Sequence, residues 1–350
     1  MPEIEISACS LAARREKLKK EAINNGYDKE GWFKKSGERA SNGAFERQSA
    51  IFNKKFGYEK DELKPEKGRY RLIWAAICPW ATRQVITLKL LGIGEDIVSI
   101  GKVNPLKTDK GWEFSLDKDS KDPVLGFSTV PEAYYFTDPG YQLRPTVPFV
   151  ADTITKKIVN NDFKNLTKEW ILGFKEYHKS GAPDLYPLEL REEIDKLNDW
   201  LYDRVNNGVY KAGFAANQEQ YEKNYKLVFE SLDILEERLS KNRFLFGDYI
   251  TDSDVRLYVT LARFDVAYYF GFRLNYKRLR DYPNLWNYTK ELYSIKAFSE
   301  STDFDAIKRG YLLLDNGENP FKILPLGPDT EAFSEPNNRE ELFGPIKFNY

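Results

Sequence analysis

The pattern of hydrophobic and polar positions divides the chain into two parts. Between residues 67 and 175, apolar residues gather in short runs of strand length, separated by segments rich in polar residues, Gly and Pro. Beyond Pro187 they recur at spacings of three and four residues, which is typical of amphipathic helices. The pattern therefore predicts a mixed α/β part followed by an all-helical part.

The first part is expected to hold a strand, a helix, a strand, two strands around a polar turn and a helix: residues 69–77, 79–92, 95–100, 144–159 and 160–171. The first helix should end at Gly92, because glycine commonly terminates helices. The last should begin at Asn and Asp, which are good N-cap residues. A long loop precedes the paired strands. The order β-α-β, β-β-α is that of a thioredoxin-like domain.

The second part is predicted to contain helices only. Residues 188–206 and 220–240 both carry apolar stripes that should bury against other helices. In the second helix the stripe is Tyr225, Val228, Leu232, Leu235 and Leu239. Thr251 stands three residues before Asp254, which predicts a capping box, so we expect Asp254 to be structural and not catalytic.

These elements define the expected domain organisation. Residues 1–66 are polar and broken by glycine, and we interpret them as an extension that wraps a folded body. Residues 67–175 would form a thioredoxin-like thiol-binding domain and residues 183–328 an all-helical domain. Residues 329–350, with Pro, Asn and Glu, would form an extended C-terminal arm.

Charge and hydropathy narrow the range of partners and locations. The chain has 53 basic and 54 acidic side chains, a formal charge of −1, which gives no reason to expect nucleic acid or an anionic membrane as a partner. No apolar run approaches the about 20 residues of a membrane span. The N-terminus is charged where a signal peptide would be apolar, so we expect a cytoplasmic protein.

The counts of cysteine and histidine exclude several mechanisms. Two cysteines, Cys9 and Cys78, do not make a disulfide framework. With His178 as the only histidine, a zinc site of the Cys/His type or a Ser-His-Asp triad lacks its residues. No spacing of carboxylates favours a metal site, so no metal or cofactor is expected.

Cys78 stands where the first strand becomes a helix, and two interpretations compete. It is either a small buried apolar residue, as we expect for Cys9, or a nucleophile. Pro79 suits the first helical position, which puts Cys78 at the N-cap. There the helix dipole and free N–H groups favour a thiolate, so a lowered pKa is expected. Ala81 stands where a dithiol protein has its second cysteine, so a mixed disulfide on Cys78 must be resolved by a thiol from solution.

Val147-Pro148, in "TVPFV", occurs where thioredoxin-like folds have a cis-proline that faces the helix N-terminus. In that position the backbone of Val147 can pair with an extended thiol peptide. The alternative is an ordinary proline at a sheet edge.

Several motifs occur in one order from Tyr70 to Pro328: "CPWA", "GW", "TVP", "IVNN", "NNGVYKAGFA", "RFDVAYYFGF", "DYPNLW" and "NPFKILPLGP". Through them the chain resembles the glutathionyl-hydroquinone reductases, also called the Xi class of glutathione transferases. The resemblance implies a thioredoxin-like domain followed by an all-helical glutathione-transferase C-terminal domain. It also implies a homodimer that reduces glutathionyl-hydroquinones with glutathione.

The resemblance further implies roles for individual residues. The family's catalytic cysteine corresponds to Cys78, and its hydroquinone pocket to Tyr210, Tyr268 and Tyr311. Its contacts to glutathione correspond to Trp112, Arg144 and the backbone of Val147. Taken without the motifs, each of these tyrosines would be interpreted as a core or interface residue.

The chain also departs from the family pattern. Thr82 replaces a usual histidine, and "GYLLLD" at residues 310–315 replaces a stretch richer in His, Tyr and Ser. "NNDFKNL" replaces "NNESSEI", so Asp162 and Phe163 stand where Glu and Ser contact the γ-glutamyl group. Phe163 would offer only its backbone N–H to the carboxylate. Glutathione should therefore bind weakly, unless Arg144 or a partner subunit supplies the contact, and another low-molecular-weight thiol is an alternative co-substrate.

Two other functions stay open on the sequence. One is a thiol transferase, deglutathionylase or dehydroascorbate reductase of the glutathione transferase superfamily. The other is a non-catalytic binding protein with the same fold.

Overall fold

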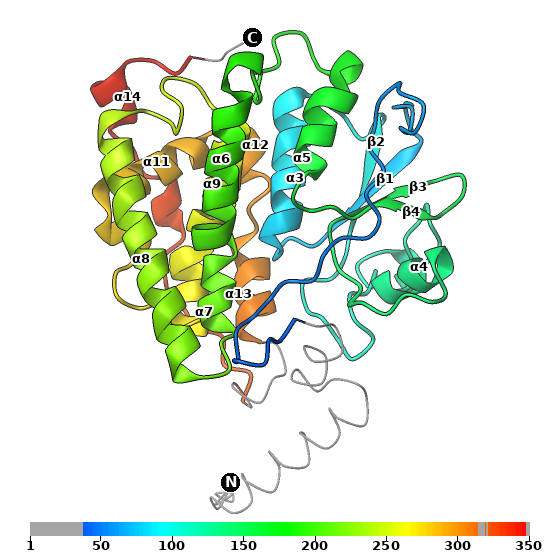
Figure 1. The fold of residues 1–350 in the computed structure, drawn as a ribbon, viewed down its shortest axis with the longest axis horizontal. Coiled ribbons are helices and arrows are strands. Elements are labelled where there is room, and N and C mark those ends of the chain that lie inside the picture. The colour runs from blue at the N-terminus through cyan, green and yellow to red at the C-terminus, as the bar shows by residue number, and fades with distance from the viewer. Residues whose placement is uncertain (1–37, 314–318, 320, 348–350) are drawn as a thin grey trace, which may run out of the picture.

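The computed structural model of the chain describes residues 38–313, 319 and 321–347. Its first half contains a mixed four-stranded sheet in the order β2-β1-β3-β4 (Figure 1). The strands are β1 (Tyr70–Trp74), β2 (Val98–Lys102), β3 (Phe149–Asp152) and β4 (Ile158–Asn160). β1 pairs in parallel with β2 and antiparallel with β3, and β4 pairs antiparallel with β3. This topology confirms the predicted thioredoxin-like fold.

Helix α3 (Pro79–Leu91) connects β1 to β2 and has the predicted ends. Cys78 is its N-cap, with Pro79 in the first turn. Gly92 ends it in the left-handed conformation, at φ 71°, so that the last carbonyl groups are capped by the following N–H groups. Local signals were sufficient to define this helix.

Three elements of the first half differ from the prediction. β1 stops at Trp74, and the next three residues form a turn into Cys78, whose N–H donates to Ala75 O at 2.9 Å. The long loop contains a helix, α4 (Val130–Thr137), whose N-cap Thr129 accepts from the N–H of Glu132. The helix expected over residues 160–171 begins only at α5 (Leu166–Lys168) and continues as the π-helix η2 (Glu169–Gly173).

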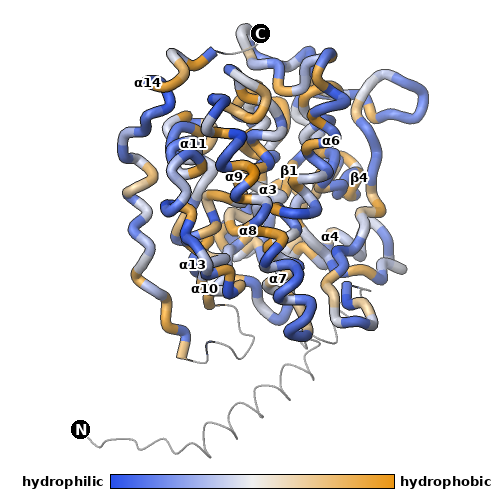
Figure 2. The backbone as a smooth tube through the Cα atoms, turned by 60° about the vertical axis from the view of Figure 1, so that its left-hand side comes forward, coloured by the Kyte–Doolittle hydropathy of each residue, from blue (hydrophilic) through white to orange (hydrophobic). Residues whose placement is uncertain are grey.

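The second half is all-helical, as predicted. Its main helices are α6 (Arg191–Leu201), α7 (Gly208–Gly213), α8 (Gln218–Lys241), α9 (Asp252–Arg263), α11 (Pro283–Ser294) and α13 (Phe304–Leu312). The helix predicted over residues 188–206 is divided into a 3-10 turn, α6 and a π-helix, η5 (Tyr202–Asn206). Thr251 and Asp254 form the predicted capping box of α9. Every residue of α9 is buried, and hydrophobic segments gather in the middle of the molecule around α9 and β1 (Figure 2).

The two halves meet where α3 packs against α9. Residues 38–66 extend along the edge of the sheet and contact both halves. Lys54 N–H donates to Val159 O at 3.1 Å, and Phe56 packs its ring against Tyr70 and Trp170. On the helical side, Arg39 donates to Phe214 O at 2.5 Å.

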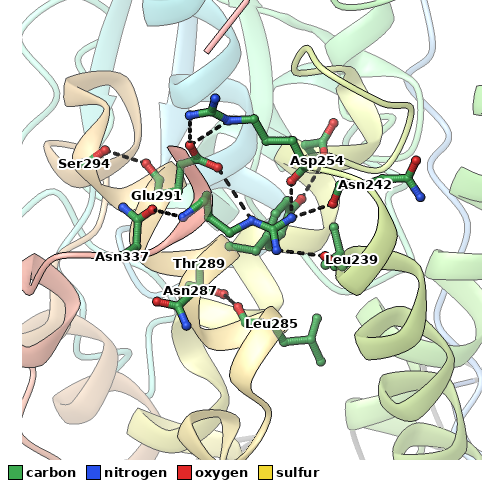
Figure 3. A network of polar contacts seen from close by, with 12 residues as sticks. Leu239, Asn242, Asp254, Leu285, Asn287, Thr289, Glu291, Ser294 and Asn337 are labelled. Atoms are coloured by element: carbon green, nitrogen blue, oxygen red, sulfur yellow. Dashed lines mark hydrogen bonds and ion pairs between the residues drawn. The ribbon is translucent and has the colours of Figure 1, made fainter. Parts of the chain in front are cut away.

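The C-terminal arm is not simply extended, contrary to the prediction. It contains the 3-10 helix η8 (Glu331–Ser334) and the short helix α14 (Arg339–Phe343). Arg339 is fully buried and donates to Leu239 O at 2.8 Å and Asn242 O at 2.5 Å. Figure 3 shows these bonds beside Glu291, which pairs with a second buried arginine, Arg243. The arm is therefore held by a polar network that its sequence does not reveal.

Within the described ranges, the structure contains no helix that combines the length and the apolar character needed to span a membrane.

Candidate active site

Cys78 lies at the junction of β1 and α3 and faces the start of β3. Its Sγ is 3.5 Å from the carbonyl oxygen of Val147, and the Val147-Pro148 peptide bond is cis. The side chain is partly exposed. The structure thus brings together Cys78, Val147 and Pro148, as the sequence predicted. Cys9, the other cysteine, lies outside the described residues, as do residues 314–315 of the "GYLLLD" segment.

The predicted lowering of the thiol pKa is wrong in direction. Burial raises the pKa of the Cys78 thiol, and this effect outweighs those that lower it. The lowering effects come from the N–H groups of Ala81 and Trp80 and from the charges of Arg263 and Arg47. The helix terminus lowers the thiol pKa as expected. The surrounding side chains, however, exclude water from the sulfur, and this desolvation raises the pKa by more than the helix terminus lowers it.

Arg263, at the end of α9, anchors the turn that carries Cys78. Its guanidinium donates to Ile77 O and Ala76 O, both at 2.9 Å, and to the hydroxyl of Thr82 at 2.8 Å. The same hydroxyl donates to Cys78 O at 3.0 Å. Arg263 is fully buried, and each of these acceptors is neutral, so its positive charge is available to a thiolate. Thr82 is therefore part of this anchor.

The three predicted tyrosines meet through their hydroxyl groups. The hydroxyl of Tyr210, on α7, is 2.5 Å from that of Tyr311, on α13, and 3.3 Å from that of Tyr268. Tyr268 comes from the π-helix η6 (Phe264–Tyr268), and its hydroxyl is 3.4 Å from that of Tyr311. Burial raises the pKa of all three phenols, so they are neutral donors and acceptors at physiological pH.

Two contacts connect this phenol cluster to the cysteine. The ring of Trp80, in the first turn of α3, lies 6.1 Å from the ring of Tyr210. Gly310 lets α13 approach the Cys78 turn, since a Cβ there would be 2.5 Å from a methyl carbon of Ile77. Tyr311 follows Gly310 directly, and its hydroxyl is the one that bonds to Tyr210.

The side chain of Arg144, a predicted glutathione contact, is engaged within the protein. Its Nε and Nη2 each lie 2.9 Å from a carboxylate oxygen of Glu38, whose side chain is fully buried. Burial raises the pKa of Glu38, but the charge and hydrogen bonds of Arg144 outweigh it and hold the pKa below its usual value. Arg144 is thus charge-compensated by a segment that precedes the sheet. Trp112 is buried before α4, where its carbonyl accepts from Val130 N–H at 2.9 Å.

The turn of Asp162 and Phe163 differs from the expectation. The carboxylate of Asp162 accepts from Lys164 N–H at 3.2 Å and from Asn165 Nδ2 at 2.7 Å. Phe163 N–H donates to Asn161 O at 2.8 Å, so it is not the free helix-terminal donor that we expected. The reason is that α5 begins only at Leu166. The Phe163 ring packs against Trp80, with centroids 5.1 Å apart.

Sequence reasoning missed two arginines of this region, Arg263 and Arg47. Arg263 is at the end of a helix that contains a second arginine, Arg256, and nothing in the sequence distinguishes its role. Arg47 is in the polar N-terminal segment and gave no signal, yet its guanidinium lies 4.7 Å from the ring of Tyr210. Among the residues described, no group of three or more His, Cys, Asp or Glu side chains could hold a metal ion.

Comparisons with known proteins agree with this architecture. The family model for "Glutathione S-transferase, C-terminal domain" matches residues 218–291. The chain is 38% identical over 281 residues to glutathionyl-hydroquinone reductase YqjG of Escherichia coli, covering 80% of this chain and 85% of that protein.

Solved structures give the same result. The glutathione transferase Xi of Phanerochaete chrysosporium has a TM-score of 0.78 at 39% identity, over 82% of this chain and 98% of that one. The glutathione-bound structure of YqjG from Escherichia coli has a TM-score of 0.77 at 36% identity and covers 83% of this chain and 96% of that one. The chain therefore belongs to the Xi class of glutathione transferases, the family of the glutathionyl-hydroquinone reductases, and is an enzyme of the glutathione transferase superfamily.

Proposed function

We propose that the protein reduces glutathionyl-hydroquinones to hydroquinones, with glutathione or a related thiol as the reductant and Cys78 as the nucleophile. One observation carries the proposal: a single cysteine at a helix N-terminus lies next to a cluster of three phenols, and Trp80 bridges the two. The glutathione-bound state of the E. coli relative supports glutathione as the thiol.

The proposed reaction has two steps. Cys78 thiolate attacks the sulfur of the conjugate, the carbon–sulfur bond to the ring breaks, and the ring carbon takes up a proton. This leaves a mixed disulfide between Cys78 and glutathione. A second glutathione attacks that disulfide, which releases glutathione disulfide and restores the Cys78 thiol. The net change is conjugate plus glutathione to hydroquinone plus glutathione disulfide.

The phenol cluster suits the first step. Its neutral hydroxyls can hydrogen-bond the ring hydroxyls of the substrate and supply the proton to the ring carbon. A thiol transferase acting on glutathione disulfide does not need such a cluster, which favours the reductase over that alternative. A non-catalytic binding protein would not need Arg263 beside its cysteine.

The test is release of free hydroquinone from a glutathionylated benzohydroquinone in the presence of glutathione, followed by chromatography. Cys78→Ser should abolish release, while Cys9→Ser should retain it. A protein that reduces dehydroascorbate or hydroxyethyl disulfide but releases no hydroquinone is instead a thiol transferase. Near-normal release by Cys78→Ser contradicts the cysteine mechanism.

We also propose the homodimer that the family resemblance implies. Sedimentation analysis of the full chain measures the mass directly, and a single species of 40.8 kDa would contradict the dimer.

A further inference from the structure

Three buried donors around Trp80 have no acceptor. Arg47 Nη2, Trp80 Nε1 and Arg83 Nε are buried and form no hydrogen bond with any residue that the structure describes. The guanidinium carbons of Arg47 and Arg83 lie 4.9 Å and 5.2 Å from the centroid of the Trp80 ring. A buried donor without an acceptor costs roughly 1–3 kcal/mol, so three in one place indicate a missing partner.

The charge of Arg47 defines that partner. Its Nε donates to the side-chain amide oxygen of Asn207 at 2.9 Å, which is a neutral acceptor. Among the described residues it has no ion pair, since the neighbouring carboxylate, Glu38, is bound by Arg144 through two hydrogen bonds. A guanidinium with a free N–H and no hydrogen-bonded carboxylate suits an incoming carboxylate, which can accept from it in a charge-assisted bond.

The position of Arg47 defines which molecule would bring the carboxylate. Its guanidinium carbon is 4.7 Å from the ring of Tyr210 and 6.0 Å from that of Phe163. It thus lies between the phenol cluster and the turn of Asp162 and Phe163. The phenols already provide donors and acceptors for ring hydroxyls. The turn provides no free donor at Phe163, because that N–H is bonded to Asn161 O.

We propose that Arg47, together with the indole N–H of Trp80, binds a carboxylate of the thiol co-substrate. Arg47 thereby takes the role expected of Arg144 and compensates for the serine hydroxyl that Phe163 lacks. This inference rests on the proposed function only in that a carboxylate-bearing thiol enters the Cys78 site. The other oxygen that Arg47 could bind there, a ring hydroxyl of the hydroquinone, is distinguished in the experiment.

The experiment is a calorimetric titration, which does not depend on turnover. Three ligands are titrated: glutathione, cysteamine (a thiol without a carboxylate) and free hydroquinone. Each is titrated into the unmodified protein and into the Arg47→Met, Arg47→Lys and Trp80→Phe variants. Arg238→Met, in α8, is the control. Like Arg47, Arg238 lies over an aromatic ring, with its guanidinium carbon 5.2 Å from that of Phe246, and donates to a neutral oxygen, that of Leu245. Thermal melts accompany each titration.

Arg47→Met should weaken glutathione binding about tenfold or more, the loss of one charge-assisted hydrogen bond, and leave cysteamine unchanged. Trp80→Phe should weaken it less, and Arg238→Met not at all. If Arg47→Met does not fold, Arg47→Lys, which keeps the charge but loses the planar fork, should show an intermediate loss.

Equal losses for glutathione and cysteamine would overturn the proposal, as would unchanged glutathione binding in Arg47→Met. So would a loss confined to titration with free hydroquinone, since the ring oxygen would then be the ligand. A protein that binds glutathione through Arg47 but releases no hydroquinone would contradict the proposed function and leave this inference standing.

Discussion

Cys78 combines opposing influences on one sulfur atom. Burial withdraws water from the thiolate, while the N–H groups of Trp80 and Ala81 and the charges of Arg263 and Arg47 attract it, and burial prevails in the ligand-free protein. The thiol is therefore mostly protonated at neutral pH, and its reactivity should depend strongly on pH.

We expect iodoacetamide to alkylate Cys78 at a rate that still rises with pH above the ordinary thiol pKa of about 8.5. The reason is that only the thiolate reacts and its pKa is raised. The measurement is the alkylation rate from pH 6 to 10 in a Cys9→Ser background. A plateau below pH 7 would show that the helix terminus outweighs burial after all.

The phenol cluster should act on the ring and not on the thiol. Tyr210→Phe removes the hydroxyl that bonds both other phenols, at 2.5 Å and 3.3 Å, so it should lower hydroquinone release by about 10²-fold or more, as expected for loss of a proton donor. Tyr268→Phe and Tyr311→Phe should have smaller effects. All three should retain exchange with glutathione disulfide at Cys78. A parallel loss in both assays, or a lowered melting temperature, would indicate structural damage instead.

At the scale of elements, a feature could be predicted when the residues that determine it are neighbours in the sequence. The strand, Cys78, Pro79 and Gly92 define α3 within a few positions, so its start and end were predictable. Burial of the thiol depends on helices that come much later in the chain. For that reason neither the raised thiol pKa nor the anchoring of the turn by Arg263 could be predicted from the sequence.

The same distinction applies to the turn of residues 160–165. Asn and Asp there are good helix caps by composition, but Asp162 uses its carboxylate on Lys164 and Asn165 within a preceding turn. Asx turns of this kind compete with helix initiation, and the choice between them is made by contacts such as the ring of Phe163 on Trp80. The tyrosines were found from motifs, since no periodicity distinguishes them from core residues.

Arg263 should be a positioning residue for Cys78. Arg263→Gln removes the guanidinium donors to Ile77 O and Ala76 O and leaves Ala76 O only the weaker bond from the Thr82 hydroxyl at 3.4 Å. A buried carbonyl without a donor costs roughly 1–3 kcal/mol. The substitution also removes a charge that lowers the thiol pKa, so alkylation of Cys78 at pH 8 should slow. Arg339→Gln is the matched control, because this buried arginine also donates to backbone carbonyls.

Arg339→Gln should lower the melting temperature comparably and leave the pH profile of alkylation unchanged. A slowing of alkylation in both variants would mean that loss of stability alone explains the effect.

Replacing Asp162-Phe163 by Glu-Ser should lower the Michaelis constant for glutathione several-fold. The turnover at saturating glutathione should change little. The replacement should also cost roughly 2 kcal/mol of stability, because Phe163 is partly buried and full truncation of a buried Phe costs about 3–5 kcal/mol. Steady-state kinetics and melting curves measure the two effects separately. An unchanged Michaelis constant would show that the turn does not contact the thiol.

At the scale of the whole molecule, residues 38–66 hold the two halves together. Glu38 pairs with Arg144 next to β3, and Arg47 reaches the phenol cluster of the helical half. The segment therefore contributes charges to both sides of the candidate site, which a covering segment without function would not do.

Glu38→Gln should destabilise the protein by about 3–5 kcal/mol at pH 7, since it leaves Arg144 without its partner. Because the pKa of Glu38 is lowered on folding, this contribution is present above its unfolded pKa of about 4.3 and is lost as the pH falls through the folded value. Denaturant melts of both proteins between pH 7 and pH 3 measure the difference. A difference that does not shrink in acid would contradict the assignment.

The anchoring of the Cys78 turn by Arg263 also has a consequence for biosynthesis. Arg263 and Ile77 are 186 positions apart, so the nucleophile leaves the ribosome long before the cation that acts on it. Until α9 has been synthesised and has docked, the thiol lacks that charge and its turn lacks three hydrogen bonds. In a growing or truncated chain Cys78 is therefore a solvent-exposed thiol whose pKa is not raised by burial, so it can form mixed disulfides with small thiols until folding buries it.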